Sequence, residues 1–236
     1  MAMLIAAAAV FLGIHLLIAG TKVRDAITGA IGERPYLGLF SLASVGVIVW
    51  LVMAYNAVQP TAENIVLYNL GEGVHHFGIP IVALAFLLGV QGLLMPNPTT
   101  VQQEGAVSRE GTIHGVLRIT RHPFLWGVAI WSAFHLAANG DLASVILFGT
   151  FLLLSILGTF SIDAKRKRKL GAAWDAFEAK TSNVPFAAVI AKRNTLNITE
   201  SLGWRFWVAL LIFVVVLFSH ARVIGVSPFP NGYIPF

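Results

Sequence analysis

Six apolar segments, each close to the length of a helix that crosses a bilayer, dominate this sequence. They fall at roughly 3–20, 37–56, 76–95, 122–138, 142–162 and 204–220. A hydrocarbon core of ~30 Å takes about 20 residues of helix, and no segment alternates polar and apolar residues as a half-buried strand does. The sequence therefore predicts an all-α, polytopic integral membrane helix bundle of about six transmembrane helices, in a single domain over residues 1–236.

The composition agrees with a membrane protein. Hydrophobic residues make up 57% of the chain and charged residues 11%, whereas a soluble domain carries about 25% charged residues. There is no cysteine, which excludes disulfides, iron–sulfur clusters and thiolate-ligated haem. The net charge of +5 is also seen in nucleic-acid-binding proteins, but here the basic residues lie between apolar segments, where anionic lipid attracts them. We therefore expect membrane lipid, and no nucleic acid, as a partner.

The basic residues are confined to alternate loops. If all six segments cross the membrane, fifteen of the sixteen Lys and Arg residues lie on one side, and only Arg222 lies on the other. Basic loops remain in the cytoplasm under the positive-inside rule. The sequence therefore predicts that both termini are non-cytoplasmic.

The loop 163–203 is the longest hydrophilic region. It begins with five consecutive basic residues at 165–169 and continues with Leu170, Trp174 and Phe177 at helical spacing. A basic face opposite an apolar face is typical of a helix that lies on the membrane surface. We expect a cytoplasmic amphipathic helix that contacts lipid; the alternative is a lid over a pocket on the cytoplasmic side.

Histidines on four of the apolar segments are the candidate functional residues. His15 lies on the first segment, His76 on the third, His122 and His135 on the fourth, and His220 at the end of the sixth. Hydrolase, zinc-protease and nucleotide-binding motifs are absent from the sequence. One histidine alone is more often a packing residue, but two imidazoles from facing helices can hold haem b within a bundle.

The fourth segment opens with Arg121, His122 and Pro123. Proline is favourable in the first turn of a helix, because its missing N–H has no partner there in any case. A basic loop enters the membrane at this point, so Arg121 is expected to meet lipid phosphate. We interpret this tripeptide as mainly structural.

Several motifs together resemble the NnrU family. They are His15 before a basic loop, IGERPY at 31–36, LRITRHP at 117–123, Trp131 with His135, Gly171 with Trp174 and Phe177, VPFAA at 184–188, and His220. They run through nearly the whole chain in the family's order. NnrU proteins are bacterial membrane proteins associated with nitrite and nitric oxide reduction, and the same domain family includes 15-cis-zeta-carotene isomerase of plants and cyanobacteria.

The resemblance implies a haem b (iron) cofactor with His15 and His135 as the metal ligands. It further implies a bacterial inner-membrane protein with an accessory, redox or nitric-oxide-linked role in denitrification, and a small hydrophobic or gaseous ligand. The isomerase branch carries a cysteine three residues before the second histidine, proposed as a redox-dependent ligand. This chain has Ser132 there, so the ligand exchange proposed for that cysteine is impossible.

Depth in the membrane leaves other histidine pairs open. At 1.5 Å per residue, His15 lies ~18 Å from the outer end of its segment and His135 only ~6 Å from it. By depth alone, His76 and His220 are better partners for His135, and His122 is a better partner for His15. These three histidines remain alternative cofactor ligands.

Three other functions compete with a denitrification role. One is cis–trans isomerisation of the zeta-carotene type. Another is methyl transfer from S-adenosylmethionine, because RHP, an apolar hairpin and G-x-x-W-x-x-F resemble membrane methyltransferases such as isoprenylcysteine carboxyl methyltransferase; Arg121, His122 and the loop 163–186 would then bind the cofactor. The third is a non-enzymatic assembly factor. The substrate and the oligomeric state do not follow from the sequence.

Overall fold

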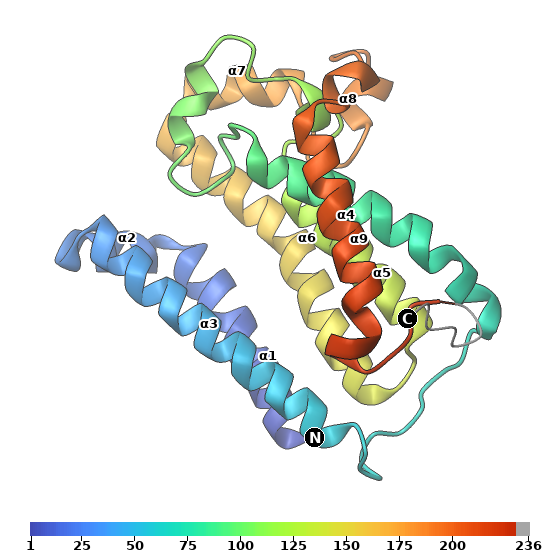
Figure 1. Ribbon diagram of the computed structural model, residues 1–236. Coiled ribbons are helices and arrows are strands. Elements are labelled where there is room, and N and C mark those ends of the chain that lie inside the picture. The colour runs from blue at the N-terminus through green and yellow to red at the C-terminus, as the bar shows by residue number, and fades with distance from the viewer. Residues whose placement is uncertain (230–236) are drawn as a thin grey trace.

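The computed structural model describes residues 1–229, and these residues form helices joined by loops (Figure 1). The α-helices are α1 (Ala2–Gly13), α2 (Lys22–Ile31), α3 (Glu33–Val58), α4 (Gly78–Leu94), α5 (Pro123–Ala138), α6 (Leu142–Leu170), α7 (Ala172–Lys180), α8 (Ala187–Ile190) and α9 (Trp204–Ile224). A π-helix, η1 (Ile14–Ala19), continues α1, and the 3₁₀ turns are η2 (Glu72–Phe77), η3 (Glu104–Ser108), η4 (Gly115–Arg118) and η5 (Ile198–Ser201).

The predicted fold class is confirmed. Five helical segments in the described part are long and apolar enough to cross a membrane: Ala2–Ala19, Glu33–Val58, Glu72–Leu94, Leu142–Leu170 and Trp204–Ile224. The sixth predicted segment is α5, a shorter apolar helix of 16 residues. The only strand-like feature within residues 1–229 is one isolated bridge between Val66 and Asp141.

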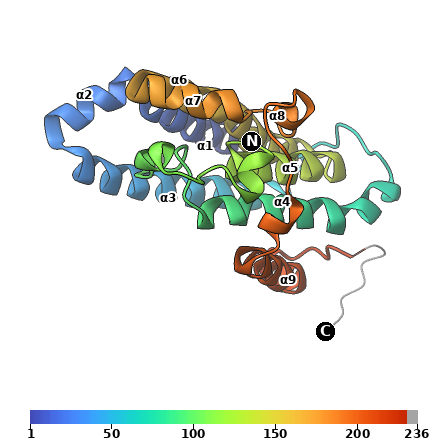
Figure 2. The same ribbon diagram turned by 90° about the horizontal axis from the view of Figure 1, so that it is seen from above.

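The helices form two layers that meet along α6. In the larger layer α5 packs between α4 and α6, and α9 packs on α4. In the smaller layer α1 packs on α3, and both contact α6 (Figure 1, Figure 2). A cluster of buried side chains joins the layers at one end; it includes Leu4, Leu51 and Leu147.

Glycines let α4 and α5 approach closely. A Cβ atom on Gly127 would lie 2.6 Å from the backbone oxygen of Ala85 and 2.8 Å from the Cα of Gly89. One on Gly92 would lie 2.4 Å from the ring of Pro123. Small residues at such crossings replace side-chain packing by backbone contact, which is common between membrane helices. The short helix α5 is therefore held against α4 along its length.

The prediction of a lipid-surface helix in the loop 163–203 is wrong. The basic run continues α6 as far as Leu170, where the cations are favourable at the helix C-terminus. The next helix, α7, buries Trp174 completely and leaves Phe177 only 4% exposed. Its apolar face packs against protein, so these two rings do not contact lipid.

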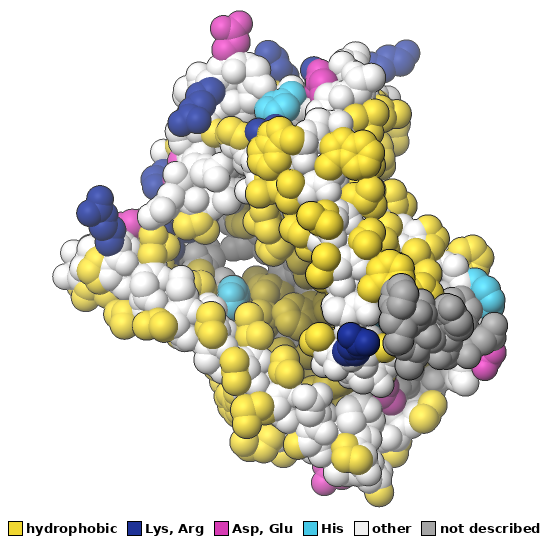
Figure 3. All heavy atoms as spheres, viewed as in Figure 1, with side chains coloured by type: hydrophobic (Ala, Val, Ile, Leu, Met, Phe, Trp, Pro, Cys, Tyr) yellow, Lys and Arg dark blue, Asp and Glu magenta, His cyan; other side chains and the backbone are white. Residues whose placement is uncertain are grey.

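The charge distribution supports the predicted orientation. Figure 1 places Met1 and the end of α9 toward the same end of the molecule, and Figure 3 shows most of the visible Lys and Arg side chains gathered at the other.

We expect a C-terminal alkaline phosphatase fusion to be active and a C-terminal green fluorescent protein fusion to be dark, because both termini are predicted to lie outside the cytoplasm. Fusions within the loop 163–203 serve as the opposite control. A fluorescent, phosphatase-inactive C-terminus would reverse the orientation.

Candidate functional site

His15 lies in the π-helix η1, within the first membrane segment. Its Nδ1 atom is 2.8 Å from the backbone oxygen of Phe11. Its ring contacts those of Phe11 and Phe40, with centroids 4.5 and 5.2 Å away. Short π-helical insertions widen the helix locally and are frequent at functional sites. The local backbone therefore sets His15 apart from an ordinary helical packing residue.

His135 lies in the last turn of α5, surrounded by aromatic side chains. Its Nδ1 atom is 2.8 Å from the backbone oxygen of Trp131. Ring centroids of Trp131 and Phe148 lie 4.7 and 4.8 Å from its own, and Phe134 packs edge-on at 5.6 Å. The close α4–α5 crossing holds this helix, so the position of His135 is set by backbone packing.

The two histidines share one hydrogen-bonding state. A carbonyl oxygen only accepts, so the Nδ1 atom of each ring carries the proton and donates it to the carbonyl four residues earlier. The Nε2 atom of the neutral ring then holds a lone pair. No hydrogen bond joins either Nε2 atom to another group within residues 1–229. This is the form in which an imidazole binds a metal, with Nδ1–H fixing the tautomer.

A chain of aromatic rings connects His15 with His135. Phe11, beside His15, contacts Phe151 at 5.5 Å, and Phe151 contacts Trp131, beside His135, at 5.9 Å. The ring of His135 packs against that of Phe148. Phe148 lies one turn of α6 before Phe151, closer to the start of that helix. Three aromatic rings, those of Phe11, Phe151 and Trp131, thus lie along the path between the two imidazoles.

A buried hydroxyl lies one turn before His135. Ser132 is completely buried, and its Oγ atom has no hydrogen-bond partner among the described residues. A buried polar group without a partner costs about 1–3 kcal/mol. Ser132 is thus an enclosed hydroxyl without a partner, one turn of α5 before His135.

The histidines do not gather into a site for a bare metal ion. Within residues 1–229, no group of three or more His, Cys, Asp or Glu side chains is arranged to hold one. A haem iron needs only axial protein ligands, because the porphyrin supplies the other four nitrogens. The residues present therefore fit a haem better than a structural or hydrolytic metal centre.

Two of the alternative histidines lie at the His135 end. His220 lies in the C-terminal part of α9, and its Nδ1 atom is 2.7 Å from the backbone oxygen of Val226. The turn η2, which contains His76, packs against α5.

His122 belongs to a different site, at the basic end of the bundle. It is 2% exposed, and its Nε2 atom lies 2.6 Å from a carboxylate oxygen of Asp163. The same carboxylate accepts two hydrogen bonds from Arg121, at 2.9 and 2.5 Å, and one from Asn183 at 3.1 Å. Asp163 is the only acidic residue of α6. It therefore joins the start of α5, the end of α6 and the loop after α7.

Arg121 does not meet lipid phosphate, which corrects the expectation from the sequence. Arg121 is 6% exposed, and its side chain pairs with Asp163 and lies 3.2 Å from Glu178. Its Cζ atom lies 5.8 Å from the centroid of the Trp174 ring. The point at which we expected a basic loop to enter the membrane is thus a buried network of ion pairs. Arg121 and the Nε2 atom of His122 are paired with protein groups, whereas the buried Nδ1 atom of His122 has no hydrogen-bond partner among the described residues.

Hydrogen bonds also hold the backbone at and just before the Arg121–His122–Pro123 tripeptide. The N–H of Arg121 donates to the carbonyl of Ser182 at 2.9 Å, and the N–H of Phe186 donates to the carbonyl of Ile119 at 2.8 Å. The hydroxyl of Thr120 donates to the carbonyl of Asn183 at 2.5 Å. These hydrogen bonds join the segment that contains the RHP motif to the segment that contains the VPFAA motif.

Comparisons with known proteins give the chain its family. The family profile described as NnrU protein matches residues 3–228. The chain is similar to the chloroplastic 15-cis-zeta-carotene isomerases of Zea mays, 24% identical over 181 residues, and of Arabidopsis thaliana, 27% identical over 82 residues. These matches cover 74% and 35% of this chain, and 47% and 22% of the two plant proteins. The chain thus spans less than half of either relative, and no solved structure matches it. It belongs to the NnrU family.

Proposed function

We propose that this protein binds haem b within the membrane, with His15 and His135 as its axial ligands. The observation that carries the proposal is their common hydrogen-bonding state, with Nδ1 bound to a helix carbonyl and Nε2 free. The rings of Phe11, Phe151 and Trp131 lie along the path between the two histidines and would have to move apart for one iron to reach both; the aromatic side chains would then cover the porphyrin. Haem supplies an iron that polarises or oxidises a ligand; the protein supplies the imidazoles, the apolar walls and the exclusion of water.

The activity that the comparisons support best is cis–trans isomerisation of a long polyene. Both named relatives are 15-cis-zeta-carotene isomerases. Figure 3 shows a recess with hydrophobic walls between the α1–α3 layer and the side of α9. A recess open toward the bilayer gives an elongated, water-insoluble substrate direct access from lipid.

A redox or nitric-oxide-linked role in denitrification, in a bacterial inner membrane, is the second candidate. Ser132 favours it, because the residue next to His135 offers a hydroxyl and no sulfur ligand. An imidazole would then have to leave the iron before a gas could bind.

We expect the protein purified from haem-sufficient cells to carry b-type haem with a low-spin spectrum. His15→Ala and His135→Ala should each lose the pigment or shift its Soret band, because each removes an axial ligand. His114→Ala is the matched control, since His114 lies in a loop on the basic side and bonds only to neighbouring carbonyls. Colourless wild-type protein that takes up no haem on reconstitution, or unchanged spectra in both variants, would refute the proposal.

Two assays separate the candidate activities. Conversion of 9,15,9′-tri-cis-zeta-carotene in a carotenoid-producing host would establish isomerisation. Ready binding of carbon monoxide or nitric oxide to the reduced haem, without conversion, would favour the nitric-oxide-linked role.

A further inference from the structure

A pocket of about 370 Å³ opens where α4 ends and η3 begins. Ligand sites usually occupy about 300–1,000 Å³, so this space is large enough for a small headgroup. One wall is apolar, formed by Leu93, Leu94, Met95 and Pro96; the other consists of Gln102, Gln103, Gly105, Ala106 and Arg109. No element of the haem proposal uses this pocket.

The polar wall presents donors and no carboxylate. Arg109 is exposed and forms no ion pair within the described part of the chain. The Oε1 atom of Gln103 accepts a hydrogen bond from the N–H of Asn97 at 2.9 Å, which leaves its NH₂ group free. The side chain of Gln102 has no hydrogen-bond partner among residues 1–229. Three side chains therefore offer N–H groups to one space, which is the requirement for binding an anion.

The carboxylate of Glu104, which lies between the pocket residues Gln103 and Gly105, is already neutralised. Glu104 is paired with Arg166 and Lys169. Burial alone would raise the pKa of Glu104, but hydrogen bonds from a backbone amide and from Arg166 outweigh it and lower that pKa to about 2. The charge that remains at the pocket is the positive charge of Arg109.

The backbone at the polar wall is held in an uncommon conformation. Gln102 has a φ of 62°, in the left-handed region that non-glycine residues seldom adopt. Such conformations cost about 1–3 kcal/mol and cluster at ligand sites.

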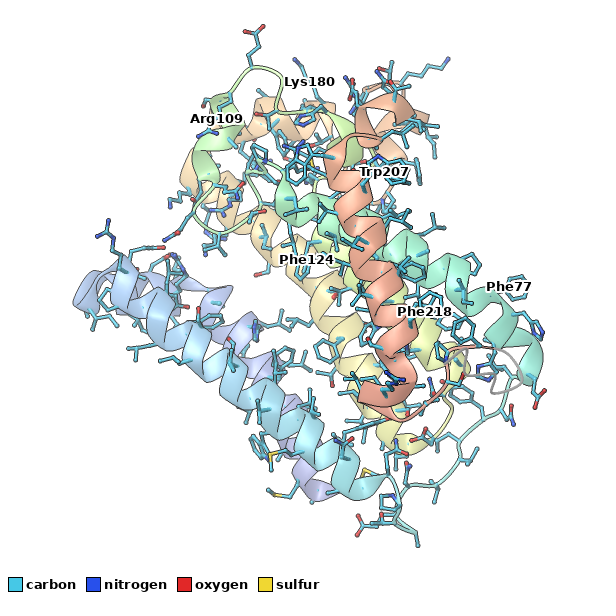
Figure 4. All side chains as sticks on the ribbon, viewed as in Figure 1. Phe77, Arg109, Phe124, Lys180, Trp207 and Phe218 are labelled. Carbon is cyan, nitrogen blue, oxygen red and sulfur yellow. The ribbon has the colours of Figure 1, made fainter. Side chains whose placement is uncertain are left out.

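The pocket lies where the candidate membrane segment Glu72–Leu94 ends. Leu94, in its apolar wall, is the last residue of α4, and its carbonyl accepts a hydrogen bond of 3.0 Å from Arg205. Arg205 is at the start of α9, next to the exposed ring of Trp204. Figure 4 shows Arg109 toward the same end of the molecule as Trp207 and away from Phe77. A polar half and an apolar half at this depth match a phospholipid.

We propose that this α4–η3 pocket binds the phosphate headgroup of an anionic phospholipid from the leaflet on the basic side of the membrane. Arg109 and the two glutamine amides bind the phosphate oxygens, and the acyl chains follow the exposed side chains of Leu93 and Leu94. An anionic lipid is preferred over a zwitterionic one, because the residues that line the pocket include a cation, Arg109, and no carboxylate to match a choline.

Native mass spectrometry of the full chain, extracted from nanodiscs of equal parts phosphatidylglycerol and phosphatidylcholine, tests the proposal. Wild-type protein should retain one phosphatidylglycerol in preference to phosphatidylcholine. Arg109→Gln should reduce that retention about tenfold, as expected for the loss of a hydrogen bond to a charged group. Gly105→Trp should abolish it by filling the pocket; a Cβ at Gly105 has no neighbour within 4 Å, so the backbone tolerates the change.

Arg34→Gln is the matched control, because Arg34 is exposed, lies at the start of α3 on the same side, and has no ion pair in the described region. It should leave retention unchanged. Equal retention in Arg109→Gln and wild type, or no preference for phosphatidylglycerol, would overturn the proposal. Displacement of the lipid by inorganic phosphate would assign the pocket to a soluble anion and overturn the lipid assignment. Haem content serves as a separate readout and should not change in either pocket variant.

Discussion

Asp163→Ala should destabilise the basic end of the bundle by about 3–5 kcal/mol, the usual cost of removing one partner of a buried ion pair. The alanine leaves the guanidinium of Arg121, 6% exposed, with only Glu178 at 3.2 Å, and leaves the Nε2 atom of His122 unpaired. The loop that contains Asn183 also loses a contact with α6. We expect a much lower unfolding temperature in detergent and reduced amounts of folded protein in the membrane.

Asp175→Ala is the matched control for that variant. Asp175 also lies on the basic side and faces a lysine at 3.6 Å, but both side chains are exposed. Exposed pairs contribute about 0–1 kcal/mol, so this change should be nearly neutral. Equal unfolding temperatures for Asp163→Ala and Asp175→Ala would show that the buried network does not hold this end of the bundle.

A double variant tests whether the loss of stability in Asp163→Ala comes from the charge of Arg121 that is left unpaired. Arg121→Met with Asp163→Leu removes both charges and keeps apolar volume, which often restores the stability that a single deletion loses. Recovery relative to Asp163→Ala would identify the unpaired charge as the cause. A His122→Ala change with normal haem and expression but no function would instead give this histidine a direct functional role.

The membrane helices could be located from the sequence because a chain that crosses a bilayer must form apolar helices of about 20 residues. Length and hydropathy alone predict segments such as 37–56 and 204–220, which the structure places in α3 and α9. The same reasoning failed at Trp174 and Phe177. Helical spacing shows that one face is apolar, but lipid and protein satisfy an apolar face equally, and α7 uses it to pack on protein.

Asp163 was missed because its partners are distant in the sequence. It lies 41 residues from His122, and nothing local marks it as an ion-pair residue. The one local signal is weak: a single carboxylate at the end of an apolar segment, separated by Ala164 from the five basic residues at 165–169. An acidic residue at the end of a membrane segment is expected to pair with a buried cation or to belong to a functional site.

The candidate ligands His15 and His135 came from the family resemblance, and their hydrogen bonds came only from the structure. A sequence cannot reveal a π-helix at residues 14–19, since the same apolar residues suit an α-helix. The tautomer of each imidazole depends on whether Nδ1 reaches a carbonyl, which is a question of local backbone geometry.

Gly127→Ala should separate α5 from α4 and cost about 3 kcal/mol, at the upper end of the range for overpacking. The new Cβ would lie 2.6 Å from the carbonyl oxygen of Ala85 and 2.8 Å from the Cα of Gly89. These are backbone atoms, so no rotamer change can relieve the contact and the helices must move apart. The movement would displace His135, which is carried by the same helix.

Gly149→Ala, in the middle of α6, is the control, because a Cβ there has no neighbour within 4 Å. Alanine is favoured over glycine in a helix by about 0.8–1 kcal/mol, so this variant should melt at the wild-type temperature or slightly above it. Thermal unfolding of both variants in one detergent measures the difference directly. If Gly127→Ala is as stable as Gly149→Ala, the α4–α5 contact is looser than the structure shows, and the geometry that places His135 among its aromatic neighbours does not depend on it.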